Sequence, residues 1–350
     1  NSKTNHRCNS KGEKMYIKLF KDILAKNKNN NSPIYSFISI SNKCNANCKF
    51  CDIHEKKEIN TSIDIKKLLK DLKESEIKYV HFTGGGEPLA NKEIYSYFEE
   101  ATNLGLNIVF ITNGYFLNDK IIDELGKYNI KAIFFSIDSH IKEIHDKTRN
   151  VPGIFDKATY SINAIKLKYP NIKIIINHVL NRDNIDNLED FIKMKNKYKY
   201  DYLNILIVKE CPEYYFNKEQ IINYNNKINN IKKLMKANNV QLLADELDYF
   251  SSNCYTEDGS DLRKNAIPCQ ILNYCCFIDC VSGNVYPCDC SVHRDYNYYC
   301  MGNIKQNSIK EIMNSEKASK LRKELLKCSK CKSKCDYANM YFNKVINEKQ

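Results

Sequence analysis

The stretch S-N-K-C-N-A-N-C-K-F-C-D, residues 41–52, decides how this sequence is interpreted. It holds Cys44, Cys48 and Cys51, separated by three and then two residues. Thiolates this close together bind iron or zinc, and a cubane iron–sulfur cluster has four irons to coordinate. Three local cysteines therefore predict a cluster with one iron open to a small molecule. Zinc is the alternative, but no second C-x-x-C pair stands near this loop.

A regular alternation of strands and helices surrounds the loop. Apolar alternation predicts six strands, at 34–40, 78–82, 106–111, 130–137, 172–180 and 202–208. Helical periodicity predicts helices between or after them, at 61–75, 91–104, 118–127, 154–168, 185–198 and 217–238. We expect Thr61 or Ser62 to be the N-cap of the first of these helices. Such βα repeats form a parallel sheet, and six of them predict an α/β fold with a partial (β/α)6 TIM-like barrel.

Polar residues follow four of these strands directly. They are Cys44–Cys51, Gly84–Pro88, Thr112–Gly114 and Ser136–Ser139. Parallel barrels carry their chemistry at the carboxyl ends of the strands, so these four segments are expected to form one site.

The cysteine content indicates metal binding. The 350-residue chain has 16 cysteines and no apolar signal segment at its start, which is unlike a short secreted disulfide scaffold. Ten of them lie between Cys269 and Cys335, whereas Cys8, Cys211 and Cys254 stand apart and are expected to be ordinary thiols.

The net charge of +12 comes from lysines spread along the whole chain. Diffuse charge does not favour a nucleic-acid partner, which would need a basic patch. No apolar run approaches the roughly 18 residues that span a bilayer, so we expect no membrane segment and a cytoplasmic protein.

The chain is expected to have three parts. Residues 1–33 form a polar leader, residues 34–245 the barrel, and residues 246–350 a small cysteine-rich domain. In the last part, the sequence around Ser282-Gly283 predicts a hairpin, and 307–326 predicts a helical stretch.

The cysteine loop, with Phe50 before its last cysteine, resembles the signature of the radical S-adenosylmethionine (SAM) superfamily. T-G-G-G-E-P at 83–88 is similar to that family's G-G-E-P motif. The resemblance implies that the open iron binds SAM and that an external donor such as flavodoxin or ferredoxin supplies an electron. A 5′-deoxyadenosyl radical then removes a substrate hydrogen. It also implies that Phe50, Gly85, Gly86 and Glu87 contact the cofactor, with Glu87 beside the SAM ammonium group.

Other cofactor contacts implied by the resemblance are weaker. They are Asn113, Ser136, Asp138 and Arg149, the last as a fork for the SAM carboxylate. Each is equally compatible with a loop residue that caps a helix or satisfies backbone groups.

The second cysteine group resembles the SPASM/twitch extension of radical SAM enzymes, which binds auxiliary 4Fe–4S clusters. Cys269 and Cys288 frame Gly283, and a short terminal run follows; that run is Cys328, Cys331 and Cys335. The short run favours the twitch form with one auxiliary cluster, and a second cluster is the alternative. Cys269 and Cys288 are the expected ligands, completed from the terminal run or by Cys275. Cys276, Cys280, Cys290 and Cys300 are surplus, as buried thiols or ligands of that second cluster.

Asp289 follows Cys288, as in anaerobic sulfatase-maturating enzymes, where an aspartate is a base; a turn residue is the alternative. An auxiliary cluster that accepts an electron favours oxidation of a small sugar-like or cyclitol substrate, as in the dehydrogenase acting on 2-deoxy-scyllo-inosamine. Many peptide-modifying enzymes of this class carry an N-terminal peptide-binding domain, and the 33 residues before the first strand are too few to form one. This favours a small molecule over a peptide. A peptide maturase, making a crosslink or an epimer, is the alternative. A non-enzymatic electron carrier is a more remote one.

Overall fold

The computed structural model describes residues 33–53, 61, 63–208, 211–243, 268–292 and 296–327. Ten strands within these residues form one sheet, in the order β10-β9-β8-β1-β2-β3-β4-β5-β6-β7. The strands are β1 Tyr35–Ser39, β2 Tyr79–Thr83, β3 Asn107–Thr112, β4 Ile130–Ser136, β5 Lys173–Leu180, β6 Tyr202–Ile207, β7 Gln241–Leu242, β8 Cys275–Asp279, β9 Asn284–Tyr286 and β10 Gly302–Asn303. The six expected strands are β1 to β6, and each pairs in parallel with the next. The α/β partial barrel is therefore confirmed.

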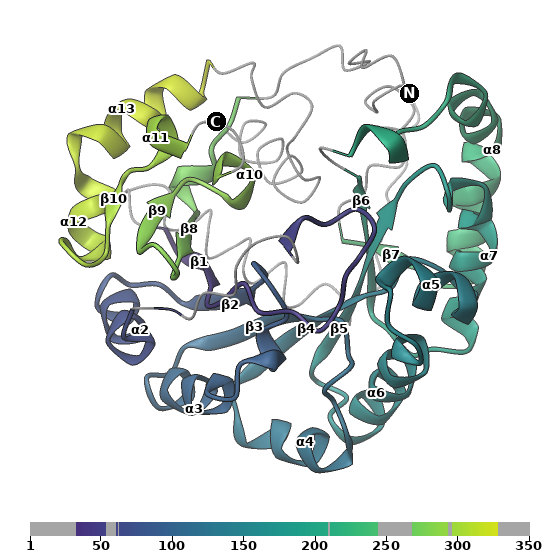
Figure 1. The fold of residues 1–350 in the computed structure, drawn as a ribbon, viewed down its shortest axis with the longest axis horizontal. Helices are drawn as coiled ribbons and strands as arrows, with labels where there is room; N and C mark the ends of the chain where they lie inside the picture. Colours follow the sequence, from purple (N-terminus) through teal and green to yellow (C-terminus); the bar gives the residue numbers. More distant parts are fainter. Residues whose placement is uncertain are drawn as a thin grey trace, which may run out of the picture.

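Most of the helices lie outside the curved sheet, as α2, α3, α4, α6, α7 and α8 show (Figure 1). The α-helices are α2 Ile65–Glu74, α3 Ile94–Asn103, α4 Asp119–Glu124, α5 Lys142–Arg149, α6 Ile154–Lys168, α7 Leu188–Lys193, α8 Lys218–Ala237, α10 Asp289–Val292, α11 Tyr296–Tyr299, α12 Ile309–Asn314 and α13 Glu316–Leu325. Short 3-10 helices are Pro88–Ala90, Leu125–Lys127, Ile185–Asn187, Met194–Asn196, Pro212–Tyr214 and Ile271–Asn273. None of the described helices is long and apolar enough to span a bilayer.

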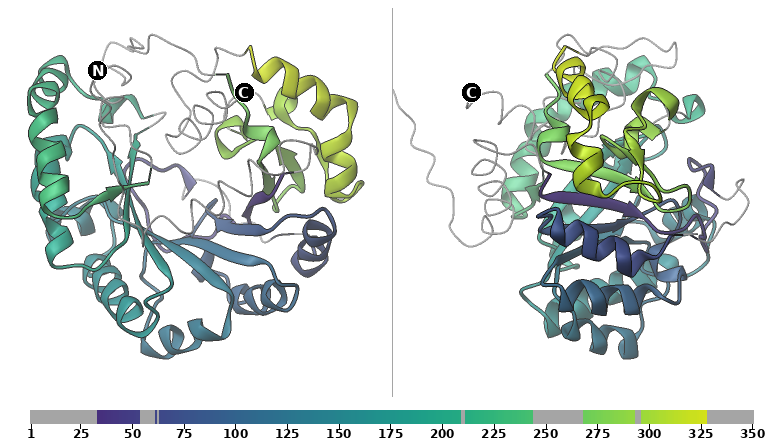
Figure 2. Two further views of the ribbon diagram at one scale, coloured as in Figure 1. Left: turned by 180° about the vertical axis from the view of Figure 1, so that it is seen from behind. Right: turned by 90° about the vertical axis from the view of Figure 1, so that its left-hand side faces the viewer.

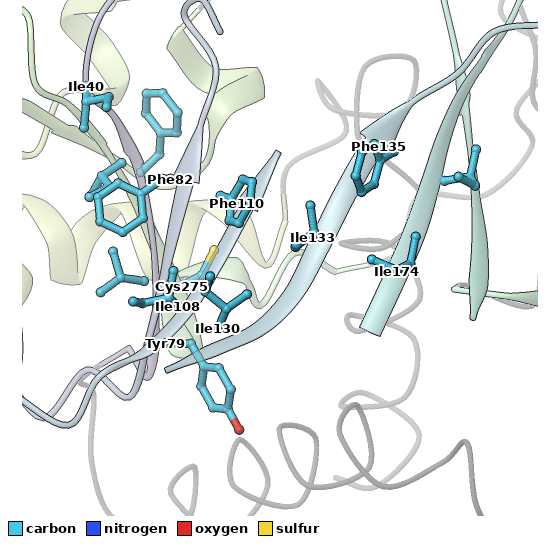
Figure 3. Packing of buried hydrophobic residues seen from close by; sticks show 14 of the residues in the cluster. Ile40, Tyr79, Phe82, Ile108, Phe110, Ile130, Ile133, Phe135, Ile174 and Cys275 are labelled. Carbon is cyan, nitrogen blue, oxygen red and sulfur yellow. The ribbon is translucent and has the colours of Figure 1, made fainter. Parts of the chain in front are cut away.

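The two faces of the sheet bury different side chains. Phe82, Phe110 and Phe135, on neighbouring strands, belong to the large core that includes the helices (Figure 3). Phe98 of α3 packs between the first two, with its ring centroid 5.2 Å from each of theirs. The opposite, inner face has a smaller apolar cluster, formed by Val109, Ala132, Phe134, Ile175 and Tyr202. Strand alternation thus separates a helix-facing core from an inner surface.

One local expectation is wrong, and the structure adds two details that were not predicted. The N-cap of α2 is Asp64, whose side chain accepts from Lys67 N at 3.0 Å. Thr61 instead donates to the carbonyl of Cys280 at 2.5 Å, and Ser62 lies outside the described residues. Helix α5 was not predicted, because its sequence is mostly polar and only eight residues long. The stretch 307–326 forms two helices, since Ser315 has extended backbone and caps the second.

The expected hairpin is present as β8 and β9, which pair antiparallel. Gly283 in its turn has φ +88°, a left-handed conformation that favours glycine. Strand β8 also pairs in parallel with β1, so the C-terminal segment continues the barrel sheet. Helices α12 and α13 lie next to these strands (Figure 2). Helix α12 also contacts α2, because Ile309 N donates to Asp71 Oδ2 at 2.8 Å. The leader and the boundary at 245 lie outside the described residues, so that division stays a prediction.

Candidate active site

The three-cysteine loop leaves the carboxyl end of β1. Cys48 is buried, and Cys44 and Cys51 are half-buried. Two backbone amides form hydrogen bonds within the loop. Ala46 N donates to Cys44 Sγ at 3.5 Å, and Cys51 N donates to Cys48 O at 3.1 Å. Burial raises the pKa of Cys44 to about 11, and it also raises the pKa of Cys51. Their thiolate forms therefore need a strong positive partner such as iron to displace the proton.

The glycine turn after β2 is hydrogen-bonded to the backbone at the start of this loop. Gly86 N donates to Ser41 O at 3.0 Å, and Glu87 N donates to Lys43 O at 2.8 Å. A Cβ on Gly86 would lie 2.0 Å from the Lys43 oxygen, and one on Gly85 would lie 2.8 Å from the Ser41 oxygen. Glycine is thus required here so that the turn can pack against the backbone that leads into Cys44. The expected contact of Gly85 and Gly86 with SAM stays a prediction.

Glu87 joins the ends of β2 and β3. It is 4% exposed. Its Oε1 accepts from Leu89 N at 3.1 Å and from Thr112 Oγ1 at 2.8 Å, and its Oε2 accepts from Asn113 N at 2.7 Å. Burial raises the pKa of Glu87 to about 7, although these three donors act to lower it. Both carboxylate oxygens of Glu87 therefore accept hydrogen bonds from the protein itself, which the sequence motif did not reveal. The expected contact of Glu87 with the SAM ammonium group stays a prediction.

Asn113 extends this network into the cysteine loop. Its Nδ2 donates to Asn45 Oδ1 at 2.9 Å, and its Oδ1 accepts from Tyr115 N at 3.0 Å. The buried Nδ2 of Asn45 has no hydrogen-bond partner among the described residues. Asn45 thus has an unpaired amide donor in the cysteine loop, next to Cys44 in sequence.

Arg149 and Asp138, both expected to contact SAM, form a buried ion pair with each other. Arg149 Nη2 lies 2.6 Å from Asp138 Oδ2, and Arg149 Nη1 donates to Cys48 Sγ at 3.6 Å. Asp138 Oδ1 accepts from Val179 N at 3.1 Å. Helix α5, which the sequence did not reveal, carries Arg149 as its last residue and thereby brings it to the cysteine loop. His145, in the same helix, is also buried, and burial lowers its pKa to about 4.

Ser136 lies on the inner face of the sheet, two residues after Phe134 of the inner cluster. Its register partner is Asn177, whose Oδ1 accepts from Asn204 Nδ2 at 2.8 Å. All three side chains are at most 9% exposed. These two asparagines were not predicted, because both were embedded in apolar strand patterns.

Phe50 packs edge-on against Tyr214, with ring centroids 6.4 Å apart. The Phe50 carbonyl accepts from Cys211 Sγ at 3.5 Å. Cys211, which was expected to be an ordinary thiol, therefore lies beside the cysteine loop. No sequence signal marked it, since it is far from both cysteine groups along the chain.

The second cysteine group is partly described. Cys275 Sγ donates to Pro287 O at 3.7 Å, which brings it beside Cys288, and Cys269 N donates to Leu325 O at 3.3 Å, close before Cys328. Cys276 in β8 and Cys280 directly after it are fully buried, as the buried-thiol interpretation expects. Asp289 is exposed at the start of α10, and its role as a base stays a prediction. Three expected ligands lie outside the described residues: Cys328, Cys331 and Cys335.

The residues of the loop fit a cluster and a bound carboxylate. Three thiols offer three ligands, and two buried donors beside them, Asn45 Nδ2 and Arg149 Nε, have no hydrogen-bond partner in the described part of the chain. Sulfide and carboxylate are acceptors without donors, so they complement such orphaned N–H groups. No three Cys, His, Asp or Glu side chains among the described residues converge on a single metal ion. A cubane cluster does not require this, because each thiolate binds a different iron.

Curated relatives match this chain over different lengths, as two of them show. The AdoMet-dependent heme synthase of Oleidesulfovibrio alaskensis is 29% identical over 160 residues, 44% of this chain and 40% of that protein. The GTP 3′,8-cyclase of Clostridium perfringens is 28% identical over 252 residues, 65% of this chain and 76% of that protein. The chain thus spans well under half of the first relative and three quarters of the second.

Solved structures share the fold over most of the chain. Streptococcus suis SuiB bound to S-adenosylmethionine has a TM-score of 0.66 at 16% identity, covering 97% of this chain and 81% of that one. The enzyme anSMEcpe with bound AdoMet has a TM-score of 0.63 at 19% identity, covering 86% and 88%.

Two family models match, and together they cover more than half of the sequence. The Radical SAM superfamily model matches residues 38–194, which hold the cysteine loop and the glycine turn. The SPASM model, an iron–sulfur cluster-binding domain, matches residues 269–336, which hold the second cysteine group. The chain therefore belongs to the radical SAM superfamily and carries a SPASM iron–sulfur cluster-binding domain.

Proposed function

We propose that this enzyme removes a hydrogen atom from a polar substrate and passes an electron from it to an auxiliary cluster. The observation that carries this proposal is the fastening of the cysteine loop by the Gly86 turn and by Arg149. With a 4Fe–4S cluster bound at Cys44, Cys48 and Cys51, SAM and one electron from a flavodoxin- or ferredoxin-like donor would supply a 5′-deoxyadenosyl radical. The protein's own part is to hold the loop, orient SAM and exclude water.

The second cysteine group is suited to take up an electron. Strand β8 is hydrogen-bonded to β1, which supports a fixed relation between Cys275 and the loop after β1. Oxidation of a carbinol to a ketone requires loss of a hydrogen atom, a proton and an electron. We assign the electron to one auxiliary cluster, with Cys269 and Cys288 among its ligands, and the proton to Asp289.

We further propose a small sugar-like or cyclitol substrate. The amide pair Asn177–Asn204 and the hydroxyl of Ser136 give the inner face of the sheet polar groups just below the strand ends. Because amides both donate and accept hydrogen bonds, they suit a substrate that carries several hydroxyl groups.

A peptide substrate is the second candidate. The structure of SuiB bound to the precursor peptide SuiA has a TM-score of 0.64 and covers 99% of this chain. That of anSMEcpe with the Cp18Cys peptide covers 89%. Those proteins bind the named peptides, and the shared fold makes a peptide maturase the alternative to test.

The test uses the anaerobically reconstituted protein with SAM and dithionite. We expect 5′-deoxyadenosine from the wild-type protein and none from the Cys48→Ala variant. An electron carrier would yield no 5′-deoxyadenosine from either. Substrate class is then read from deuterium transfer into 5′-deoxyadenosine, using ring-deuterated aminocyclitols in one arm and Cα-deuterated peptides in the other. Transfer from peptides alone would replace the small-molecule assignment with the maturase.

A further inference from the structure

Arg149 is a buried cation aimed at a cluster ligand. Its side chain is largely buried, its Nη1 donates to Cys48 Sγ at 3.6 Å, and its guanidinium carbon lies 5.8 Å from the centre of the Phe50 ring. Cys44 and Cys51 receive backbone donors, whereas Cys48 alone among the three receives a charged side-chain donor in the described residues.

Asp138 and the end of helix α5 hold the guanidinium in this position. Asp138, 1% exposed at the end of β4, binds Arg149 Nη2 at 2.6 Å and is itself fixed by Val179 N at 3.1 Å. Helix α5 ends at Arg149, because Asn150 adopts a left-handed conformation with φ 54°. Two anchors of this kind leave the side chain little freedom to leave the Cys48 sulfur.

We propose that Arg149, locked by Asp138, is a positioning residue that raises the reduction potential of the cluster bound at Cys44, Cys48 and Cys51. The inference rests on the cluster assigned under the proposed function. Reduction of that cluster adds one electron from an external reductant and makes or breaks no covalent bond. The added negative charge is stabilised by a fixed cation and by a hydrogen bond to a ligand sulfur, both of which tune cluster potentials.

This role is separable from binding of the SAM carboxylate. Nη1 and Nη2 are engaged by Cys48 and Asp138, and only the buried Nε has no hydrogen-bond partner in the described residues. A residue that served SAM alone would leave the potential of the SAM-free cluster unchanged. The decisive measurement is therefore made without SAM.

The experiment is an anaerobic potentiometric titration of the reconstituted protein with dithionite and redox mediators, followed by electron paramagnetic resonance. The cluster is identified as the one whose signal changes when SAM is added to a separate sample. At a fixed potential, we expect Arg149→Gln to lower the ratio of reduced to oxidised cluster about tenfold, or 59 mV for one electron. Arg149→Lys keeps the charge and should lie between Gln and wild type.

Lys142→Gln is the matched control, because it removes one positive charge from the exposed start of the same helix, where Lys142 pairs with Asp156. It should leave the ratio unchanged. The double variant Asp138→Asn/Arg149→Gln removes both buried charges together and so avoids an unpaired carboxylate. The ratio should fall there too, but by less, because loss of the carboxylate partly offsets loss of the cation. A cluster-loaded Gln variant, single or double, with the wild-type ratio overturns the inference. Absence of any SAM-responsive signal in the wild-type protein would instead overturn the cluster assignment.

Discussion

Replacing Gly86 by alanine should disable the cysteine loop without unfolding the barrel. The added Cβ would lie 2.0 Å from the Lys43 carbonyl oxygen, 2.4 Å from its carbon and 2.8 Å from the Asn42 carbonyl carbon. All three are backbone atoms of the segment that leads into Cys44, so no side-chain rotation can relieve the contact.

The size of the disturbance follows from these distances. Carbon–oxygen contacts normally begin at roughly 3.3 Å, so Lys43 must move by about 1 Å or more. Overpacking of this kind costs about 1–3 kcal/mol of stability. The same displacement at a reacting centre can lower the rate of the chemical step about 100-fold. We therefore expect a folded protein whose cluster is lost or displaced.

The assay combines three measurements on the anaerobically reconstituted variant. Circular dichroism should show a folded α/β protein. Iron per chain should fall by about four if the cluster is lost. The rate of 5′-deoxyadenosine formation should fall about 100-fold or more if the cluster is retained but displaced.

Gly84→Ala is the matched control. Its Cβ would meet only atoms of its own turn, the nearest being the Gly86 oxygen at 3.0 Å. It should keep most of the iron and the activity. Full iron content together with a wild-type rate in Gly86→Ala would refute the idea that the turn sets the position of the loop.

Three further predictions concern buried groups. Glu87→Gln removes one of two acceptor oxygens and should lower stability by about 1–3 kcal/mol at pH 5. Because burial raises the pKa of Glu87 from 4.5 to about 7, the folded state loses stability as pH rises through that interval, so melting temperatures of variant and wild type should converge toward pH 8. Asp138→Asn leaves Arg149 as an unpaired buried charge and should cost about 3–5 kcal/mol in thermal or denaturant unfolding; a loss within error would show that the pair is not buried in solution. Cys276→Ala should keep all iron, whereas Cys288→Ala should lose about four irons per chain, and equal iron in the two would contradict the ligand assignment.

The sequence predicted the barrel because strand and helix periods are local properties. Six strands, most helices and the clustering of motifs at strand ends followed from apolar spacing alone. Helix α5 was not predicted, because the residues that it buries are His145 and Arg149 and it has no apolar stripe. The N-cap of α2 was misassigned because several capping residues stand in sequence before Ile65, and only the structure shows which one accepts from a backbone amide.

The sequence singled out residues that the structure places around the cysteine loop, but it did not predict their contacts with one another, and their roles toward a cofactor stay predictions. The motifs identified Glu87, Asp138 and Arg149 as residues near a ligand. In the structure Glu87 accepts from the backbone directly after β3, and the other two bind each other. Such pairings depend on which strand ends meet in space, so no spacing along the chain encodes them. The asparagine pair on the inner face was missed for the same reason.

The pairing of β8 with β1 also constrains how the polypeptide reaches its native state. Cys276 and Ser36 touch across 240 residues of chain. During synthesis, β1 must therefore wait with one edge unpaired until the ribosome has released the segment around Cys275–Asp279. Contacts of such long range slow folding, and an unpaired strand edge invites association with other chains. A chain that ends before β8 would leave this edge of β1 open, and we expect such a chain to associate with other chains.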